Sequence, residues 1–173
     1  MEAELRTAIG ALTMAMRIEQ NGYRFYRRAA EETDDPKAKE LFNGLAEDEI
    51  AHESILRTRL KALEQDGEWK PVAATEWPDA VPFEGEGPIF SRERIEEGVR
   101  DYTSELSALR MAYLIEKNAV EFYTKAARET DDPVGKAMYQ DLVDWEKTHQ
   151  RVLEEEYEFL AERFKLDMGF APF

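Results

Sequence analysis

The feature that most constrains this chain is an internal repeat. Residues 11–56 align without a gap on residues 108–153, with 21 identities in 46 positions. Both copies contain Glu-x-x-His, as Glu49 and His52 and, 97 positions later, as Glu146 and His149, and these are the only two histidines of the chain. Because helical residues three positions apart share a face, each copy can present a carboxylate and an imidazole together. The repeat predicts two equivalent units, each holding part of a metal site.

Each repeat has the pattern of a helical hairpin. Apolar residues recur at alternating three- and four-residue steps in two long stretches, which the run Thr-Asp-Asp-Pro separates at 33–36 and again at 130–133. An aspartate can cap the first amides of a helix, and the fixed φ of proline suits the first helical position. So short a connection forces an antiparallel return. We expect helices over about 7–33, 36–65, 104–130 and 133–164.

The segment between the repeats breaks this pattern, because four of the seven prolines lie there. We interpret it as a long crossover, with a short helix from Ser91 to near Gly98 and with Trp69, Trp77, Val81 and Phe83 packed on the outside of the bundle. The predicted fold is an all-α four-helix bundle. It forms a single domain over 1–173, made of hairpin 1 (about 7–65), a crossover (about 66–103), hairpin 2 (about 104–164) and an apolar C-terminal tail (165–173).

Composition excludes several classes of function. With no cysteine, any metal must bind to oxygen and nitrogen. A net charge of -15 would repel nucleic acid and anionic membrane surfaces, so we expect neither as a partner. No apolar run approaches the roughly 20 residues that span a bilayer, and the first residues do not resemble a secretion signal. These features predict a cytoplasmic protein.

Glutamates in the other two helices are placed to complete the site. Glu19 lies 14 residues before Thr33, and Glu49 lies 13 residues after Pro36, so at about 1.5 Å per residue both are roughly 20 Å from the turn. The second repeat has the same spacing. Packing of the hairpins about a pseudo-twofold axis would therefore gather six candidate metal ligands, namely Glu19, Glu49, His52, Glu116, Glu146 and His149.

The charge of such a layer favours two divalent cations. An ionised carboxylate left unpaired in a bundle core has a desolvation cost of roughly several kcal/mol. Two M²⁺ ions would balance the four carboxylates, and the two imidazoles could stay neutral. Oxygen-rich ligation with one imidazole per metal favours iron or manganese, and we expect two iron ions because iron also reduces dioxygen or peroxide. A metal-free bundle with a buried polar layer is the less favoured alternative, because the motif occurs twice in register.

On these motifs the chain resembles the ferritin-like diiron-carboxylate proteins, and within them the rubrerythrin group. The resemblance covers both hairpins and implies a ferritin-like domain. It also implies a role for each candidate ligand: bridging carboxylates at Glu49 and Glu146, terminal or bridging carboxylates at Glu19 and Glu116, and terminal imidazoles at His52 and His149.

The resemblance further implies that Tyr26 and Tyr123 hydrogen-bond the ligand carboxylates. Two features depart from rubrerythrins proper. Those proteins carry a cysteine-ligated rubredoxin iron domain, which this chain cannot form, so electrons would come from a separate donor protein. They also have an additional glutamate where this chain has Ala119, so the site is closer to the symmetric six-ligand cage of bacterioferritin-like proteins. We interpret Trp145, next to Glu146, as a packing residue.

Three functions stay open on the sequence. The favoured one is a diiron oxidoreductase that reduces hydrogen peroxide or dioxygen and is re-reduced by a donor protein. The second is a ferroxidase that oxidises Fe²⁺ and passes it on or stores it. The third is a metal-free helical module that binds a partner through its crossover or tail. The resemblance implies a homodimer.

Overall fold

The computed structural model describes residues 2–77 and 102–167. Four long helices make up most of this part of the chain: α1 (Glu2–Glu32), α2 (Pro36–Asp66), α4 (Tyr102–Glu129) and α5 (Pro133–Asp167). A short 3₁₀ turn, η1 (Ala74–Glu76), follows α2, and the described residues form no strand. The predicted all-α four-helix bundle is confirmed. Although the helices are long, none in the described ranges is apolar enough to cross a membrane.

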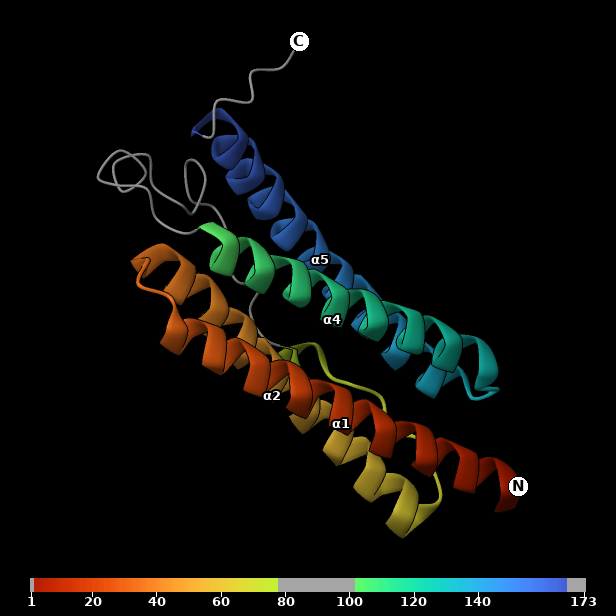
Figure 1. The fold of residues 1–173 in the computed structure, drawn as a ribbon. Helices are drawn as coiled ribbons and strands as arrows, with labels where there is room; N and C mark the ends of the chain where they lie inside the picture. Colours follow the sequence, from red (N-terminus) through yellow and green to blue (C-terminus); the bar gives the residue numbers. More distant parts are fainter. Residues whose placement is uncertain (1, 78–101, 168–173) are drawn as a thin grey trace.

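The helices form two antiparallel hairpins that point in opposite directions. Helix α1 packs along α2, α4 packs along α5, and α1 also contacts α4. Figure 1 shows the turn of the first hairpin at one end of the bundle and the turn of the second at the other. This arrangement follows from the repeat, because a pseudo-twofold axis across the bundle exchanges the two hairpins.

Both hairpin turns end in the predicted aspartate cap. Oδ1 of Asp35 accepts hydrogen bonds from the amides of Lys37 and Ala38, at 2.9 and 3.2 Å. Asp132 caps α5 in the same way, with its amide donors at 2.8 and 3.1 Å. In each helix the capping residue is followed by a proline, which has no amide hydrogen to leave unpaired. The two turns are therefore locally encoded.

The helix ends differ from the predicted bounds. Helix α1 begins at Glu2 instead of residue 7, because Leu5, Ala8 and Ile9 continue its apolar face and pack on the core. Helix α5 continues past Phe164 to Asp167, with Lys165 favourably placed near the negative end of the helix dipole. The predicted helix from Ser91 to Gly98, Val81, Phe83 and the tail beyond 167 lie outside the described residues.

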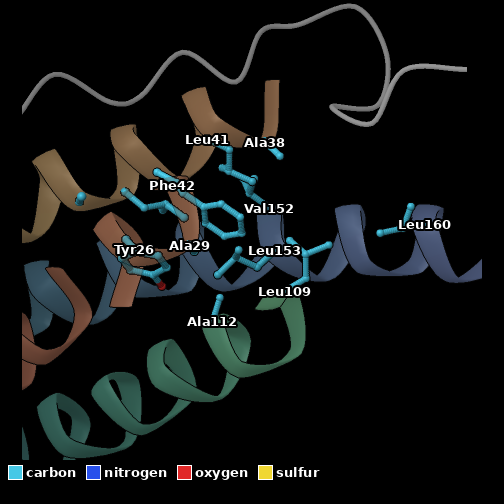
Figure 2. Close-up of a cluster of buried hydrophobic side chains, with 13 residues drawn as sticks. Tyr26, Ala29, Ala38, Leu41, Phe42, Leu109, Ala112, Val152, Leu153 and Leu160 are labelled. Carbon is cyan, nitrogen blue, oxygen red and sulfur yellow. The ribbon is translucent and has the colours of Figure 1, made fainter. Parts of the chain in front are cut away.

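The apolar core is divided into two clusters, each built from all four helices. The first lies towards the α1–α2 turn and includes Tyr26, Leu41, Leu109 and Leu153 (Figure 2). The second lies towards the α4–α5 turn, and the repeat relates its members to those of the first, as Leu12 is related to Leu109. Between the two clusters, every one of the four long helices contributes at least one buried polar side chain. The core thus encloses a polar layer on both sides.

A buried arginine holds the segment after α2 against that helix. Arg59 is 2% exposed, and its guanidinium donates to both carboxylate oxygens of Glu76, at 2.7 and 3.0 Å, and to the carbonyl of Pro71, at 2.8 Å. The sequence pattern did not predict this contact. These hydrogen bonds of Arg59 hold Glu76, and the next residue, Trp77, packs against the second apolar cluster. Trp69 packs edge-on to Tyr139, with ring centroids 5.9 Å apart. The predicted packing of these two tryptophans on the bundle is confirmed.

Two helical glycines provide a matched test of this packing. An added Cβ would meet no atom within 4 Å at Gly10, but would lie 2.7 Å from the Trp69 ring at Gly135. Gly10→Ala should stabilise the protein by about 0.5–1 kcal/mol, the helix-propensity difference. Gly135→Ala should lose this gain, because Trp69 must move. Urea unfolding followed by circular dichroism measures both, and an equal gain at the two positions would contradict the packing of Trp69.

Candidate metal centre

The six predicted ligands all lie in the polar layer between the two apolar clusters. Each is at most 3% exposed. Their donor atoms form two groups in which all atoms lie within 4.8 Å of one another: Glu19, Glu49, His52 and Glu146 in one, and Glu116, Glu146 and His149 in the other. Glu146 belongs to both groups. Glu49, which was predicted to bridge as well, belongs to one.

The shared position of Glu146 is visible in its distances to the two imidazoles. Its Oε1 lies 3.2 Å from Nδ1 of His52, and its Oε2 lies 3.2 Å from Nδ1 of His149. The two rings stack with centroids 5.9 Å apart. Nδ1 of His52 is also 3.1 Å from Glu19, and Nδ1 of His149 is 3.7 Å from Glu116. Both histidines therefore turn the same ring nitrogen, Nδ1, towards the candidate ligand carboxylates.

Two tyrosines connect the hairpins through this layer. The hydroxyl of Tyr26 on α1 donates to Glu116 on α4, and the hydroxyl of Tyr123 on α4 donates to Glu19 on α1. All four side chains are 0% exposed. The predicted contact between these phenols and candidate ligands is present, and each phenol acts on the opposite hairpin. Burial, followed by the nearby glutamates, raises the pKa of both tyrosines, which keeps them protonated as donors.

The two bridging candidates differ because the repeat is broken at one helix position. A Cβ at Gly22 would overlap the carboxylate of Glu49, so that carboxylate lies directly on the backbone of α1. The equivalent residue of the second repeat is Ala119, which is 2% exposed. Its methyl group occupies the space that Gly22 leaves open, so Glu146 cannot take the position that Glu49 takes. This difference accounts for the central place of Glu146.

Sequence reasoning missed one functional candidate, Asp48. Its side chain is buried, and its Oδ2 lies 3.0 Å from Nε2 of His149. A comparison of the two repeats does not identify Asp48, because the equivalent residue of the second repeat is Trp145. A signal was nevertheless present, since Leu45, Asp48 and His52 follow the three- and four-residue steps of the buried face.

Trp145, predicted to be a packing residue, packs against both imidazoles. Its ring centroid lies 5.9 Å from that of His52 and 6.3 Å from that of His149. Trp77 reaches His52 from the segment after α2, at 6.3 Å. The two indoles also line a pocket of about 390 Å³ together with Val72, Ala74, Asp141 and Asp144. Both indoles therefore lie beside His52, whereas Asp48 approaches Nε2 of His149.

Burial and mutual repulsion alter the pKa values of the carboxyl groups. Burial, and then the negative charge of Glu19, raises the pKa of Glu49 well above 4.5. Burial and Glu146 act in the same way on Glu116. Burial would also raise the pKa of Glu146, but the charges and hydrogen bonds of His52 and His149 lower it well below 4.5. Without metal, Glu49 and Glu116 therefore bind protons more readily than exposed glutamates do.

The pKa values of both imidazoles are raised, which favours their positively charged form. Burial alone would lower the pKa of His52, but Glu146 and Glu19 raise it to about 10. Burial opposes the charge of His149 as well, and contacts with Asp48 and Glu146 raise its pKa well above 6.5. In the metal-free protein these protons take the role that divalent cations would have, because both supply positive charge to the layer.

The residues fit a pair of divalent cations of the iron or manganese type. Each group offers carboxylate oxygens and one imidazole, the donor set that such ions accept. Oε2 of Glu116 is buried and has no hydrogen-bond partner among the described residues. An unsatisfied buried acceptor costs about 1–3 kcal/mol, and a cation would remove that cost.

These shifts predict that the metal-free protein loses stability as pH rises from 4.5 to about 10. The folded pKa values of Glu49, Glu116, His52 and His149 lie above their ordinary values of 4.5 and 6.5. Folding therefore takes up protons, which stabilises the folded state. This stabilisation is complete at low pH and is lost as the pH rises through the pKa values of the folded protein. The pKa of Glu146 is lowered, so its contribution to stability is present above pH 4.5 and is lost as the pH falls below that value.

Urea unfolding of chelator-treated protein at several pH values measures this decline. Glu49→Gln should make it shallower, because one of the four titrating groups is removed. Stability that stays constant or rises over the same range would contradict the proton assignment.

A second prediction separates hydrogen bonding from packing in the aromatic residues. Tyr123→Phe should lower the free energy of unfolding by about 1.5–3 kcal/mol, because Glu19 loses a buried donor. The control is Tyr139→Phe. Tyr139 stacks on Tyr123 at 6.2 Å, but its buried hydroxyl has no partner in the described part of the chain, and the first repeat has Phe42 there. In urea unfolding, Tyr139→Phe should leave the free energy of unfolding unchanged or raise it slightly. Equal losses of stability in the two variants would contradict the role of Tyr123.

Comparison with known proteins agrees with this geometry. A family model described as rubrerythrin matches residues 10–157, a range that includes both hairpin turns and all six candidate ligands. No curated protein and no solved structure matches the chain. The family match covers well over half of the sequence, and the chain therefore belongs to the rubrerythrin family.

Proposed function

We propose that the chain is a dinuclear non-haem iron oxidoreductase that reduces hydrogen peroxide or dioxygen with electrons from a separate donor protein. The observation that carries the proposal is the pair of buried donor groups that share Glu146. A carboxylate common to two ligand sets holds two ions close together, as two-electron chemistry requires. Membership of the rubrerythrin family supports iron as the metal. The proposal includes a homodimer, which light scattering would test.

The protein's own residues would bind the metals and keep them in place. Glu146 would bridge the two ions. One ion would be completed by Glu19, Glu49 and His52, and the other by Glu116 and His149. A bound pair of Fe²⁺ ions would supply the two electrons that, with two protons, convert one molecule of hydrogen peroxide into two of water.

The surroundings would preserve this arrangement during turnover. Tyr26 and Tyr123 hold Glu116 and Glu19 by hydrogen bonds from the opposite hairpin, so these carboxylates keep their orientation when the charge of the centre changes. The two apolar clusters exclude water from both ends of the layer. A dry and preorganised site strengthens the electrostatic interactions within it.

Metal content and peroxide consumption of Glu146→Gln test the proposal. Wild-type protein loaded with Fe²⁺ without oxygen should hold two iron ions per chain and consume peroxide continuously when a reductant is supplied. Glu146→Gln should hold fewer ions and lose at least roughly a hundredfold in rate, because loss of a shared ligand exceeds the cost of losing an outer partner. The exposed Glu154 lies on the same helix, so Glu154→Gln is the matched control and should be unchanged.

Two outcomes would count against the proposal. Iron that accumulates as oxidised iron beyond two ions per chain, without continuous peroxide consumption, would favour a ferroxidase. Wild-type protein that holds no stoichiometric metal would favour a metal-free interaction module. Elemental analysis together with the absorption spectrum after addition of peroxide or air distinguishes these cases.

A further inference from the structure

The repeat is broken at the position that directly precedes each Glu-x-x-His motif. Asp48 occupies it in the first repeat and Trp145 in the second. Asp48 on α2 places its carboxylate 3.0 Å from Nε2 of His149 on α5. Trp145 on α5 places its indole against His52 on α2, with ring centroids 5.9 Å apart. Across the two hairpins, equivalent positions thus provide a carboxylate to one imidazole and an aromatic ring to the other.

The carboxylate of Asp48 fixes how His149 can act as a ligand. Nδ1 of His149 faces Glu146 and Glu116, and its Nε2 faces Asp48. A neutral imidazole binds a metal through one nitrogen and keeps its proton on the other, and the hydrogen bond made by that proton decides which nitrogen is free. Asp48 holds the proton on Nε2 and so leaves Nδ1 directed at the metal position. Such a partner also makes the ligand more basic.

His52 has no comparable partner. Its Nδ1 faces the carboxylates as in His149, but its Nε2 is buried without a hydrogen-bond partner in the described residues. The rings of Trp77 and Trp145 lie beside it, at 6.3 and 5.9 Å. An indole N–H is a donor and cannot accept the proton of an imidazole. The Nε2 side of His52 is therefore held by packing, and its polar contacts with the described residues are made through Nδ1 alone.

We propose that Asp48 is a positioning residue that makes the two metal positions inequivalent, so that the position at His149 binds a divalent cation first and more tightly. This inference rests on the proposed metal centre and adds an order of loading to it. Donor number alone predicts the reverse, since the group around His52 offers four ligands and the group around His149 three. The two explanations can be separated by experiment.

Titration of metal-free, full-length protein with Co²⁺, followed by its absorption, tests the order of loading. Wild type should bind two ions in two steps. Asp48→Ala should weaken the first step by roughly 10–100-fold, the cost of losing such a partner, and keep a total of two ions. Asp48→Asn, which retains a neutral acceptor, should lie between the two. The exposed Asp144 lies beside the same indole, and Asp144→Ala should leave both steps unchanged.

Nitrogen NMR of ¹⁵N-histidine-labelled protein tests the contact itself, and the chain's two histidines give two ring systems to assign. In metal-free protein the Nε2 proton of His149 should be protected from exchange, and that of His52 should not. Asp48→Ala should remove the protection and leave the His52 signals in place. This readout does not depend on metal binding.

The outcomes distinguish failure of the inference from failure of the metal centre. Two Co²⁺ ions that bind wild type in a single step, or an Asp48→Ala change that weakens only the second step, would overturn the loading order alone. Equal protection of the two Nε2 protons would overturn the role of Asp48. Wild type that binds no Co²⁺ would overturn the proposed metal centre together with the loading order.

Discussion

Burial of negative charge is the constraint on which the rest of the structure depends. Four glutamates and Asp48 lie in one layer inside a helical bundle, each at most 3% exposed. An isolated buried carboxylate has a desolvation cost of roughly several kcal/mol, so the layer must contain compensating positive charge or donors. Imidazoles and phenols provide part of this compensation, and bound protons or divalent cations provide the remainder. The two apolar clusters supply the favourable free energy of burial that holds the layer together.

The pseudo-twofold arrangement meets this constraint by making each hairpin depend on the other. Glu19 on the first hairpin receives its phenol from the second, and Glu116 receives its phenol from the first. His149 likewise finds its carboxylate partner on α2. A hairpin alone would expose its apolar face and would leave these acceptors without their donors. The polar layer is therefore a property of the pair, and the core on either side contains residues of all four helices.

Much of this arrangement could be predicted from the sequence because its signals are local and repeated. The helical spacing, the Asp-Pro turns and the equal distances from turn to ligand are sufficient to place Glu19, Glu49 and His52 at one level. The contact of Asp48 with His149 could not be predicted in this way, because it depends on the register between hairpins and has no counterpart in the second repeat. From the sequence, Gly22 is only a residue of low helix propensity. Its role becomes clear from the structure, where the Glu49 carboxylate lies against it. The helix ends also depend on tertiary contacts.

Covalent linkage of the two hairpins has a consequence for how their surroundings can evolve. In a twofold dimer of identical hairpins, any substitution beside one imidazole would appear beside the other as well. In a fused chain, positions 48 and 145 are separate codons and can change independently. An aspartate at one and a tryptophan at the other is a combination that no symmetric assembly of a single hairpin could contain. Duplication followed by fusion thus frees the two halves of one centre to diverge while their shared fold is retained.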